Sequence, residues 1–431
     1  MKPLLVLALG LTLACAACNT SPLTSQMTPD LGSPPDLTPA LPEGISPLAG
    51  YDPSLPSDDL APLGALIGDR GTVGIGESIH TSGGFQLSRA RVIEYLVEQK
   101  HFRLIAIEWQ RASGDAVEAY LQSGKGTAAG VAMQLSVWSS QEVEQLLAWL
   151  RTFNLAHLDD PVHFMGFDVQ QPDVDVTTLK TFFTAAAPGD AGMLLPPLDK
   201  CDLGQGESTT GVSYLGDYPA CTAGLDAIDA YFASHQAALT QASSADQLLT
   251  ARVASTGLRA WQTEAYDFTS DVPASYQARD DAMAAVYLAL KQARHPTLKT
   301  VVWAHNYHLR QLGAAVTGDG AVGAPTMGTR LAAALGDDYF PVAQLAYDVG
   351  IDWPNVGCGP QPPADAASMP GLLNTLPVGA ALIDLASPFF QPGQSYGESD
   401  YESMIPAQQY RAIIFLKHSP KMTPLDWPSC Q

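Results

Sequence analysis

Two short motifs contain the residue types that carry out acid–base chemistry. Glu77 and His80 stand three positions apart in the segment 76–80, and His305 and His308 stand three apart in the segment 305–308. An imidazole titrates near pH 6.5, so a neutral histidine can accept a proton from water. A neighbouring carboxylate fixes the tautomer of the ring and stabilises the imidazolium that forms. We therefore expect hydrolysis by general base catalysis.

Other charged residues could complete such a site. Glu108 and Asp168 each follow an apolar run, and Arg89 lies nine positions after His80 on an amphipathic segment. An arginine or a second histidine can donate a hydrogen bond to the oxyanion that develops when a carbonyl is attacked. The helical spacing allows Arg89 to point toward the site. Asp168 is assigned a secondary role that is structural more than chemical.

Short apolar runs predict the strands that would position these residues. The runs cover residues 72–76, 102–107, 162–167, 300–304, 340–347, 381–385 and 411–416. In a parallel sheet the functional residues gather just past the carboxyl ends of the strands. The first four runs end beside Glu77, Glu108, Asp168 and His305, respectively. The order of these strand ends predicts one site along one edge of a sheet.

Helical periods alternate with these runs. Apolar spacing predicts a helix over 85–99, a capping box formed by Ser139 and Glu142, and a helix over 326–335 that Gly336 closes. The Ala-rich stretch from about 170 to 295 has helical periods at 225–239, 245–268 and 276–293. The predicted fold is an α/β domain in which helices flank a largely parallel central sheet, with a helical insertion or cap at about 170–295.

The first 18 residues resemble a secretory signal, because one lysine precedes an apolar run and small residues. Cleavage among the alanines at 14, 16 and 17 would leave a soluble secreted protein. Alternatively, Cys18 would be the acylated cysteine of an extracytoplasmic bacterial lipoprotein, periplasmic or at the cell surface. Residues 19–60 are rich in Pro, Ser, Thr and Asp and are predicted to form a tether. The catalytic domain would then span 61–431.

Four cysteines follow the predicted signal segment, and an even number in an exported chain indicates two disulfides. Three pairings are possible. The preferred one joins Cys201 to Cys221 and Cys358 to Cys430, because short loops close more readily.

The charge of the chain excludes some partners. The 431 residues include 22 Lys and Arg against 44 Asp and Glu, which gives a formal charge of −22. Nucleic-acid binding requires a basic face, so we expect no nucleic-acid partner. The same charge disfavours adsorption to anionic lipid, which leaves an anchor at Cys18 as the expected contact with a membrane.

Several segments together resemble the erythromycin esterase-like family. These segments are GIGESIHTSGGFQLSRARVIEYLVEQKHFRLIAIE at 74–108, HFMGFDVQ at 163–170, the pair Arg279-Asp280 with Met283, VVWAHNYHL at 301–309, MGTRLAAALGDDYF at 327–340, and AIIFLKHSPKMTPL at 412–425. The resemblance covers residues from about 60 to 425. It implies an α/β fold with a helical subdomain. It also implies hydrolysis of a small-molecule carboxylic ester or lactone by activated water, without a covalent intermediate and without a cofactor.

The resemblance also suggests roles by position. His80 resembles the general base, and Glu77 would orient that base or the water. His305, His308 and Arg89 would bind and polarise the ester carbonyl, Glu108 would hold the network, and Arg279 would be mainly structural. His305 could exchange roles with His80. The chain departs from the family pattern at Thr81, at 82–84 and at Trp109, which leaves a macrolide as one candidate substrate among other esters.

Three other interpretations fit parts of the sequence. The same Glu/His cluster could bind Zn²⁺ in a metal-dependent hydrolase. The segment Gly393-Gln394-Ser395-Tyr396-Gly397 matches a nucleophile elbow, with Asp400 and His418 following in the order of a serine hydrolase. Finally, an exported acidic protein could retain the pocket as a binding lipoprotein that does not turn over its ligand.

Overall fold

The computed structural model describes residues 40–204, 214–318, 321–353, 357–398 and 401–429. The predicted signal segment with Cys18, the tether up to residue 39, Asp400 and Cys430 lie outside the described residues. The predicted pairing of Cys358 with Cys430 therefore remains a prediction. In the described parts, no helix combines the length and the apolar character that a membrane span needs.

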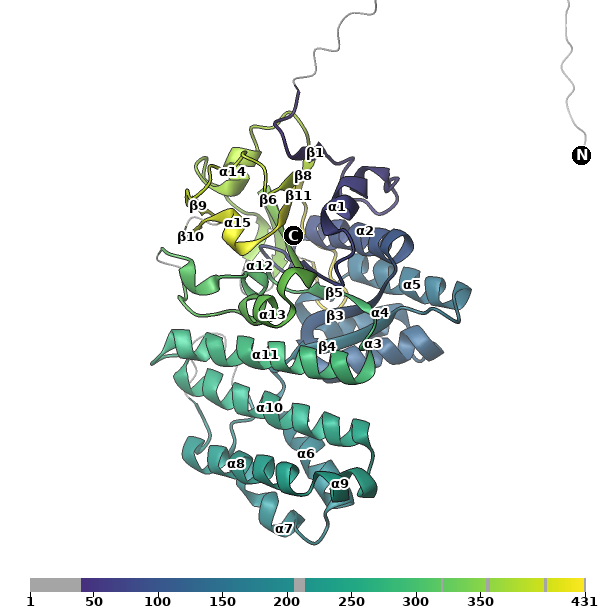
Figure 1. The fold of residues 1–431 in the computed structure, drawn as a ribbon, viewed down its shortest axis with the longest axis vertical. Helices are drawn as coiled ribbons and strands as arrows, with labels where there is room; N and C mark the ends of the chain where they lie inside the picture. The colour runs from purple at the N-terminus through teal and green to yellow at the C-terminus, as the bar shows by residue number, and fades with distance from the viewer. Residues whose placement is uncertain (1–39, 205–213, 319–320, 354–356, 399–400, 430–431) are drawn as a thin grey trace, which may run out of the picture. The chain divides into compact units, whose positions relative to one another are not determined.

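A nine-stranded mixed sheet organises the domain (Figure 1). Its strands are β1 (Ile45–Pro47), β2 (Thr72–Ile75), β3 (Phe102–Gln110), β4 (His163–Asp168), β5 (Lys299–Trp303), β6 (Tyr339–Trp353), β7 (Gly357–Pro360), β8 (Ala380–Asp384) and β11 (Ala412–Ser419). The spatial order is β1-β8-β11-β6-β2-β5-β3-β4, with β7 paired to β6. The six strands from β11 to β4 run parallel, whereas β1, β7 and β8 pair antiparallel. The predicted α/β class is confirmed.

Helices cover both faces of this sheet. They are α1 (Ala61–Ile67), α2 (Gly83–Lys100), α3 (Arg111–Ser123), α4 (Ala128–Ala132), α5 (Gln141–Ala156), α12 (Asn306–Leu309), α13 (Met327–Leu335), α14 (Met369–Leu373) and α15 (Pro406–Gln409). Alternating side chains of each strand point to opposite faces. In β5, Val301 packs with α1, α2 and α5 in one core, while Val302 packs with α13 and with a later helix, α11 (Val272–Arg294), in another. Burial on both faces explains why the parallel strands are continuous apolar runs.

A helical insertion follows β4 and returns to the sheet at β5. It contains α6 (Pro172–Ala186), α7 (Ala191–Leu194), α8 (Tyr218–Ser234), α9 (Gln236–Ala242), α10 (Ala245–Asp267) and α11 (Val272–Arg294). The insertion has its own apolar core, which lies between α6, α8 and α10. In Figure 1 these three helices lie on the far side of α11 from the sheet. Cys201 and Cys221 form a disulfide there, as predicted. Because α11 also packs on the sheet, the insertion and the sheet share an apolar core.

Short elements complete the fold. The 3₁₀ turns are η1 (Asp58–Leu60), η2 (Met133–Trp138), η3 (Pro196–Lys200), η5 (Gly313–Ala315) and η6 (Gly336–Asp338), and a separate ribbon pairs β9 (Tyr396–Gly397) with β10 (Ser403–Met404). In η2, Ser136 adopts φ 47°, a left-handed conformation that is uncommon for a residue other than glycine. This kink directly precedes Trp138.

Two local predictions were wrong. The predicted tether over 19–60 is too long, because Ile45–Pro47 forms β1 against β8 and Leu60 is buried in the core. A three-residue strand is too short to show a period in the sequence. The N-cap of α5 is Ser140, whose hydroxyl accepts from the backbone N–H of Val143, and not Ser139.

Candidate active site

Four neighbouring parallel strands bring the predicted residues to one edge of the sheet. The strands β2, β5, β3 and β4 lie side by side in this order. The residues they carry are Glu77 and His80 after β2, His305 and His308 after β5, Glu108 within β3, and Asp168 at the end of β4. The strand β3 extends past its predicted end at 107 through an irregularity in register, so Glu108 belongs to the strand itself.

Asn306 fixes the turn that carries the two later histidines. Its side-chain amide donates to the backbone carbonyl of Gln344 and to Glu398, and its carbonyl accepts from the backbone N–H of Gln344. A Cβ atom on Gly76 would lie 2.0 Å from the Asn306 carbonyl oxygen. Glycine at position 76 therefore allows the loop after β2 to approach the loop after β5.

The side chains of Glu77 and His80 form a hydrogen-bonded pair. Oε1 of Glu77 lies 2.9 Å from Nδ1 of His80, and the Glu77 side chain is completely buried while that of His80 is 19% exposed. A carboxylate oxygen accepts, so the proton of the neutral ring resides on Nδ1. The described residues offer no hydrogen-bond partner to Nε2, which leaves its lone pair free.

Two further donors hold the Glu77 carboxylate. Trp138 Nε1 donates to Oε1 at 2.6 Å, and Arg89 Nη2 donates to Oε2 at 2.5 Å. Burial would raise the pKa of Glu77, but the charge of Arg89 and the hydrogen bond with His80 outweigh it and lower the pKa. The Arg89 guanidinium stacks 4.5 Å from the centre of the Trp303 ring. Glu77 is therefore an ionised and immobile acceptor.

Both nitrogens of His305 already have partners. Nδ1 accepts from the backbone N–H of Tyr307 at 3.1 Å, and Nε2 donates to the backbone carbonyl of Ser78 at 3.0 Å. Burial and the neighbouring His80 lower the pKa of His305 to about 4. His305 is therefore a neutral ring of fixed tautomer, and its centre lies 5.2 Å from the centre of the His80 ring.

His308 has the opposite character. Its Nδ1 lies 2.9 Å from Asp280 and its Nε2 lies 3.1 Å from Glu108. Burial alone would lower the pKa of His308, but these two carboxylates raise it to about 10. His308 is therefore an imidazolium at neutral pH. The same contact, together with Arg279, holds the pKa of Glu108 well below its usual range despite its burial.

Arg279 connects the insertion to the sheet. From α11 its Nε and Nη2 donate to the two oxygens of Asp168, and Nη2 also donates to Glu108. The remaining nitrogen, Nη1, lies 3.4 Å from Nε2 of His308 and has no carboxylate acceptor among the described residues. The Arg279 side chain is 14% exposed. Its Nη1 is thus a cationic donor that bonds no carboxylate of the described residues.

Tryptophan side chains surround His80. Trp138 lies with its ring centre 4.9 Å from that of His80, and Trp353, at the end of β6, lies at 6.0 Å. Trp109 contacts Trp138 at 5.9 Å and remains partly exposed. The open side of His80 is therefore bordered by aromatic surfaces, which suit an apolar portion of a substrate.

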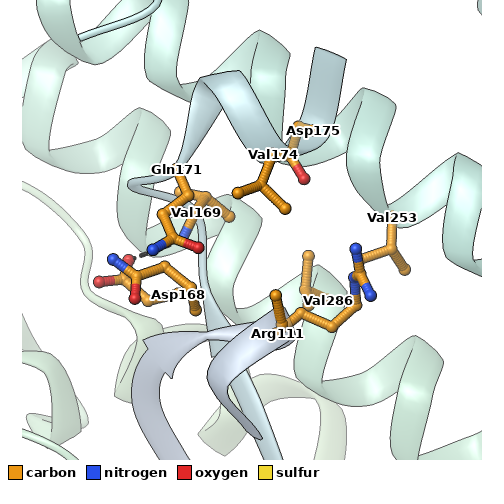
Figure 2. A pocket seen from close by; sticks show the side chains of 11 residues that line it. Arg111, Asp168, Val169, Gln171, Val174, Asp175, Val253 and Val286 are labelled. Carbon is orange, nitrogen blue, oxygen red and sulfur yellow. Dashed lines mark hydrogen bonds between the residues drawn. The ribbon is translucent and has the colours of Figure 1, made fainter. Parts of the chain in front are cut away.

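A small cavity lies behind Asp168, on the side of the insertion (Figure 2). Its volume is about 20 Å³, enough for one water molecule. Arg111 and Asp175 face each other across it in Figure 2, and burial raises the pKa of Asp175. The cavity is too small for an ester.

Comparison with known proteins agrees with this architecture. A family model described as Erythromycin esterase matches residues 97–419, more than half of the chain. The chain belongs to the erythromycin esterase family. Erythromycin esterase type II of Escherichia coli is 23% identical over 328 residues, which are 67% of this chain and 72% of that protein.

Solved structures share the fold of this erythromycin esterase family member. A protein from Bacillus cereus superposes with a TM-score of 0.69 at 16% identity, over 88% of this chain and 96% of that one. The erythromycin esterase EreC, solved as a mutant in its open conformation, gives a TM-score of 0.67 at 22% identity over 88% and 98%. Membership of the family supports a hydrolase of the esterase type.

The family match begins at residue 97, so it does not include Glu77, His80 or Arg89. Hydrogen bonds in the folded structure join the loop that follows β2 to the residues that the family model matches. The backbone N–H of Asn306 donates to the carbonyl of Glu77 at 2.8 Å, and His305 donates to the carbonyl of Ser78. The structure brings all six predicted site residues, with Asp168 and Arg279, into one contiguous network.

The network also contains residues that the sequence analysis missed. Trp138 bonds to Glu77, Asp280 bonds to His308, and Trp353 contacts His80. Asp280 directly follows Arg279 in the sequence, so the Arg279-Asp280 pair could have indicated that Asp280 also belongs to the site. Trp138 reaches the site from the kinked 3₁₀ turn η2, and the spacing of apolar residues does not predict this turn.

The burial of Arg89 does not favour the predicted contact with a substrate carbonyl. The Arg89 side chain is fully buried and donates to Glu77 and to the backbone carbonyl of Gly76. Arg89 therefore stabilises the ionised carboxylate of Glu77.

The described residues form neither a cluster of metal ligands nor a nucleophile elbow. Within the described ranges, no group of three or more His, Cys, Asp or Glu side chains is placed to hold a metal ion. The nitrogens of His305 and His308 are already hydrogen-bonded, whereas a metal ligand needs a free lone pair. Ser395 is exposed in a loop that leads directly into β9, whereas a nucleophile elbow needs a strand before it and a helix after it.

Proposed function

We propose that this protein hydrolyses a carboxylic ester or lactone by water that His80 activates, without a covalent intermediate. The observation that supports this proposal is the Glu77–His80 pair, in which one ring nitrogen bonds a buried carboxylate and the other has a free lone pair. A general base needs this arrangement. A macrolide lactone is one candidate substrate, because the family includes erythromycin esterases.

In the first step, Nε2 of His80 takes a proton from water while the water oxygen bonds the carbonyl carbon. The carbonyl π electrons move to oxygen and form an oxyanion. The imidazolium that results is stabilised by Glu77, whose negative charge lies 2.9 Å from Nδ1. Removing a positioned general base costs 10²- to 10⁴-fold in rate in typical enzymes.

We assign the oxyanion donor to Arg279. Its Nη1 has no carboxylate acceptor among the described residues and its side chain is partly exposed. His308, the other cation, has both ring nitrogens directed at carboxylates, so it acts by holding Glu108 and, through Glu108, Arg279. Arg279 was predicted from the sequence to be mainly structural, whereas an oxyanion donor has a chemical role. A preorganised cationic donor of this kind stabilises the developing charge.

In the second step, the tetrahedral intermediate collapses. The carbonyl double bond forms again, the bond from carbon to the alkoxy oxygen breaks, and His80 returns its proton to the leaving alcohol. The products are one carboxylic acid and one alcohol, and the base is neutral again. No redox partner or cofactor is required by this sequence of steps.

The proposal is tested on a panel of aryl esters and lactones that includes erythromycin, with wild-type protein and His80→Ala. We expect hydrolysis by the wild type, no initial burst of alcohol release, and loss of at least 10²-fold in kcat in His80→Ala. Excess EDTA should leave the rate unchanged. Equal inactivity of both proteins on every ester would support the binding lipoprotein instead, and a burst would indicate a covalent intermediate.

A further inference from the structure

Three side-chain oxygens without hydrogen-bond partners lie where the insertion meets the catalytic edge. Glu264 belongs to α10, Tyr276 to α11 and Tyr307 to α12. Oε2 of Glu264 and the hydroxyl of Tyr307 are buried without a hydrogen bond. Tyr276 is half-buried, and its hydroxyl makes no hydrogen bond to the residues that the structure describes. None of the three was predicted from the sequence to be a site residue.

These side chains are neighbours. The Ser275 hydroxyl donates to the backbone carbonyl of Glu264 at 2.8 Å, which joins the start of α11 to the end of α10 beside Tyr276. The rings of Tyr276 and Tyr307 are 5.7 Å apart. The charge of Arg279 acts on both Glu264 and Tyr276. The Tyr307 ring also lies 5.0 Å from the ring of His308, so all three side chains lie beside residues of the candidate site.

The described residues do not satisfy these oxygens, although Gln170 Nε2 donates to the other carboxyl oxygen of Glu264, Oε1, at 2.9 Å. Arg279, the cation that acts on Glu264, directs its Nε and Nη2 at Asp168 and Glu108. Burial and the charge of Asp168 raise the pKa of Glu264 to about 7, so this carboxyl can both accept and donate at neutral pH. A buried polar group without a partner costs about 1–3 kcal/mol. Such a cost is retained where a ligand or water supplies the missing bonds.

We propose that Glu264, Tyr276 and Tyr307 form a subsite that binds hydroxyl groups of the ester substrate, such as those of a sugar or another polyol. This inference rests on the proposed esterase function and extends it to the class of substrate.

A neutral hydroxyl fits the charges around the subsite better than an ion does. Arg279 and the imidazolium of His308 repel an ammonium group, while Asp168, Asp280 and Glu108 repel a carboxylate. A hydroxyl both donates and accepts, as a tyrosine hydroxyl does. An apolar group would leave all three oxygens without partners.

The test compares three acetate esters in a pH-stat assay: 6-O-acetylglucose, ethyl acetate and acetylcholine. We expect Tyr276→Phe and Tyr307→Phe each to lower the ratio of kcat/KM for 6-O-acetylglucose to that for ethyl acetate by about tenfold, as the loss of one hydrogen bond predicts. Tyr287→Phe is the matched control. It removes a buried hydroxyl from the same helix, about 16 Å from Tyr276 along the axis, and should leave the ratio at the wild-type value.

Neither Tyr276→Phe nor Tyr307→Phe removes a hydrogen bond between the described residues. The melting temperatures of these two variants should therefore be no lower than that of the wild type. An unchanged ratio in both variants would overturn the subsite. A fall for acetylcholine in place of the sugar ester would also overturn it, because it would indicate a site for cations.

A binding measurement separates this inference from the proposed function. We expect saturation transfer from wild-type protein and from His80→Ala to methyl glucoside, and none from the double variant Tyr276→Phe/Tyr307→Phe. If wild type binds methyl glucoside but hydrolyses no ester, the proposed function fails and the subsite stands. If wild type hydrolyses esters but transfers no saturation, the subsite fails alone.

Discussion

Oε1 of Glu77 accepts two hydrogen bonds, one from Nδ1 of His80 at 2.9 Å and one from Nε1 of Trp138 at 2.6 Å. The carboxylate is thus fixed on the side that faces the imidazole, while Arg89 bonds the other oxygen. This geometry determines which ring nitrogen carries the proton. A base whose tautomer is fixed in this way has its lone pair directed at the open side of the site.

Replacement of Glu77 by Gln should therefore lower kcat by about 10²- to 10⁴-fold, because an amide can hold the ring in the wrong tautomer and cannot stabilise the imidazolium. The change also leaves Arg89 buried without its partner, which should cost about 3–5 kcal/mol of unfolding free energy. The pair Glu77→Gln/Arg89→Met separates the two effects. We expect this double variant to regain stability in chemical denaturation and to remain inactive, and recovered activity would contradict the assignment.

Much of the site could be predicted because its residues lie next to strong patterns. The run 102–107 is mostly apolar, and it predicted a strand that brings Glu108 to the same edge as the other strand ends, although β3 continues to Gln110. His80 and His305 follow β2 and β5, which pair with each other directly. Local sequence therefore indicated both the elements and the edge on which they converge.

The remaining features depend on packing that spacing does not encode. Asp280 reaches His308 only because α11 docks on the sheet, and the two residues are 28 positions apart. The role of Arg89 depends on complete burial beside Trp303, which an amphipathic pattern does not reveal. Strand β1 is three residues long and obtains its order from pairing with β8.

His308→Asn should change how stability depends on pH. The pKa of His308 is about 10 in the folded protein against 6.5 for the free group, so the folded state binds its proton more tightly. This contribution is complete below about pH 6.5 and is lost as the pH rises toward 10, with a total on the order of a few kcal/mol. Urea titrations at pH 6 and pH 10 should show a large deficit for the variant at pH 6 and a small one at pH 10. A deficit equal at both values would refute the imidazolium.

Glu264→Gln should stabilise the protein at alkaline pH. The pKa of Glu264 is about 7 when folded against 4.5 for the free group, because burial disfavours the ionised form. The wild type therefore loses stability as the pH rises from about 4.5 to 7 and does not regain it above. Glutamine imitates the protonated carboxyl and has no charge to lose. We expect Tm of the variant to exceed that of the wild type at pH 8.5 by more than at pH 5, and the opposite order would refute the assignment.

Cys18→Ser tests the predicted anchor, which lies outside the described residues. If residues 1–18 are a lipoprotein signal, the wild type should be in the membrane fraction and the variant in the soluble extracytoplasmic fraction. Mass spectrometry of the wild type should show an acylated N-terminal cysteine. An unmodified, soluble wild type cleaved among the alanines at 14, 16 and 17 would favour the secreted form.

Trp138→Phe should lower kcat about tenfold and leave KM within about twofold, because the lost group bonds Glu77 and not the ligand. Phenylalanine retains the aromatic contact with His80 and Trp303 but removes the Nε1–H donor, so Glu77 gains freedom to rotate away from Nδ1. The buried Glu77 oxygen then has one donor fewer, which should raise the pKa of this carboxylate and move the acid limb of the pH–kcat profile upward. Trp109→Phe is the matched control, since its Nε1 donates to the backbone carbonyl of Gln134 in η2 and not to the catalytic pair. A loss of stability without a shift of the acid limb would assign Trp138 to packing alone. A shift confined to the Trp138 variant would establish that the indole N–H positions the carboxylate on which the base depends.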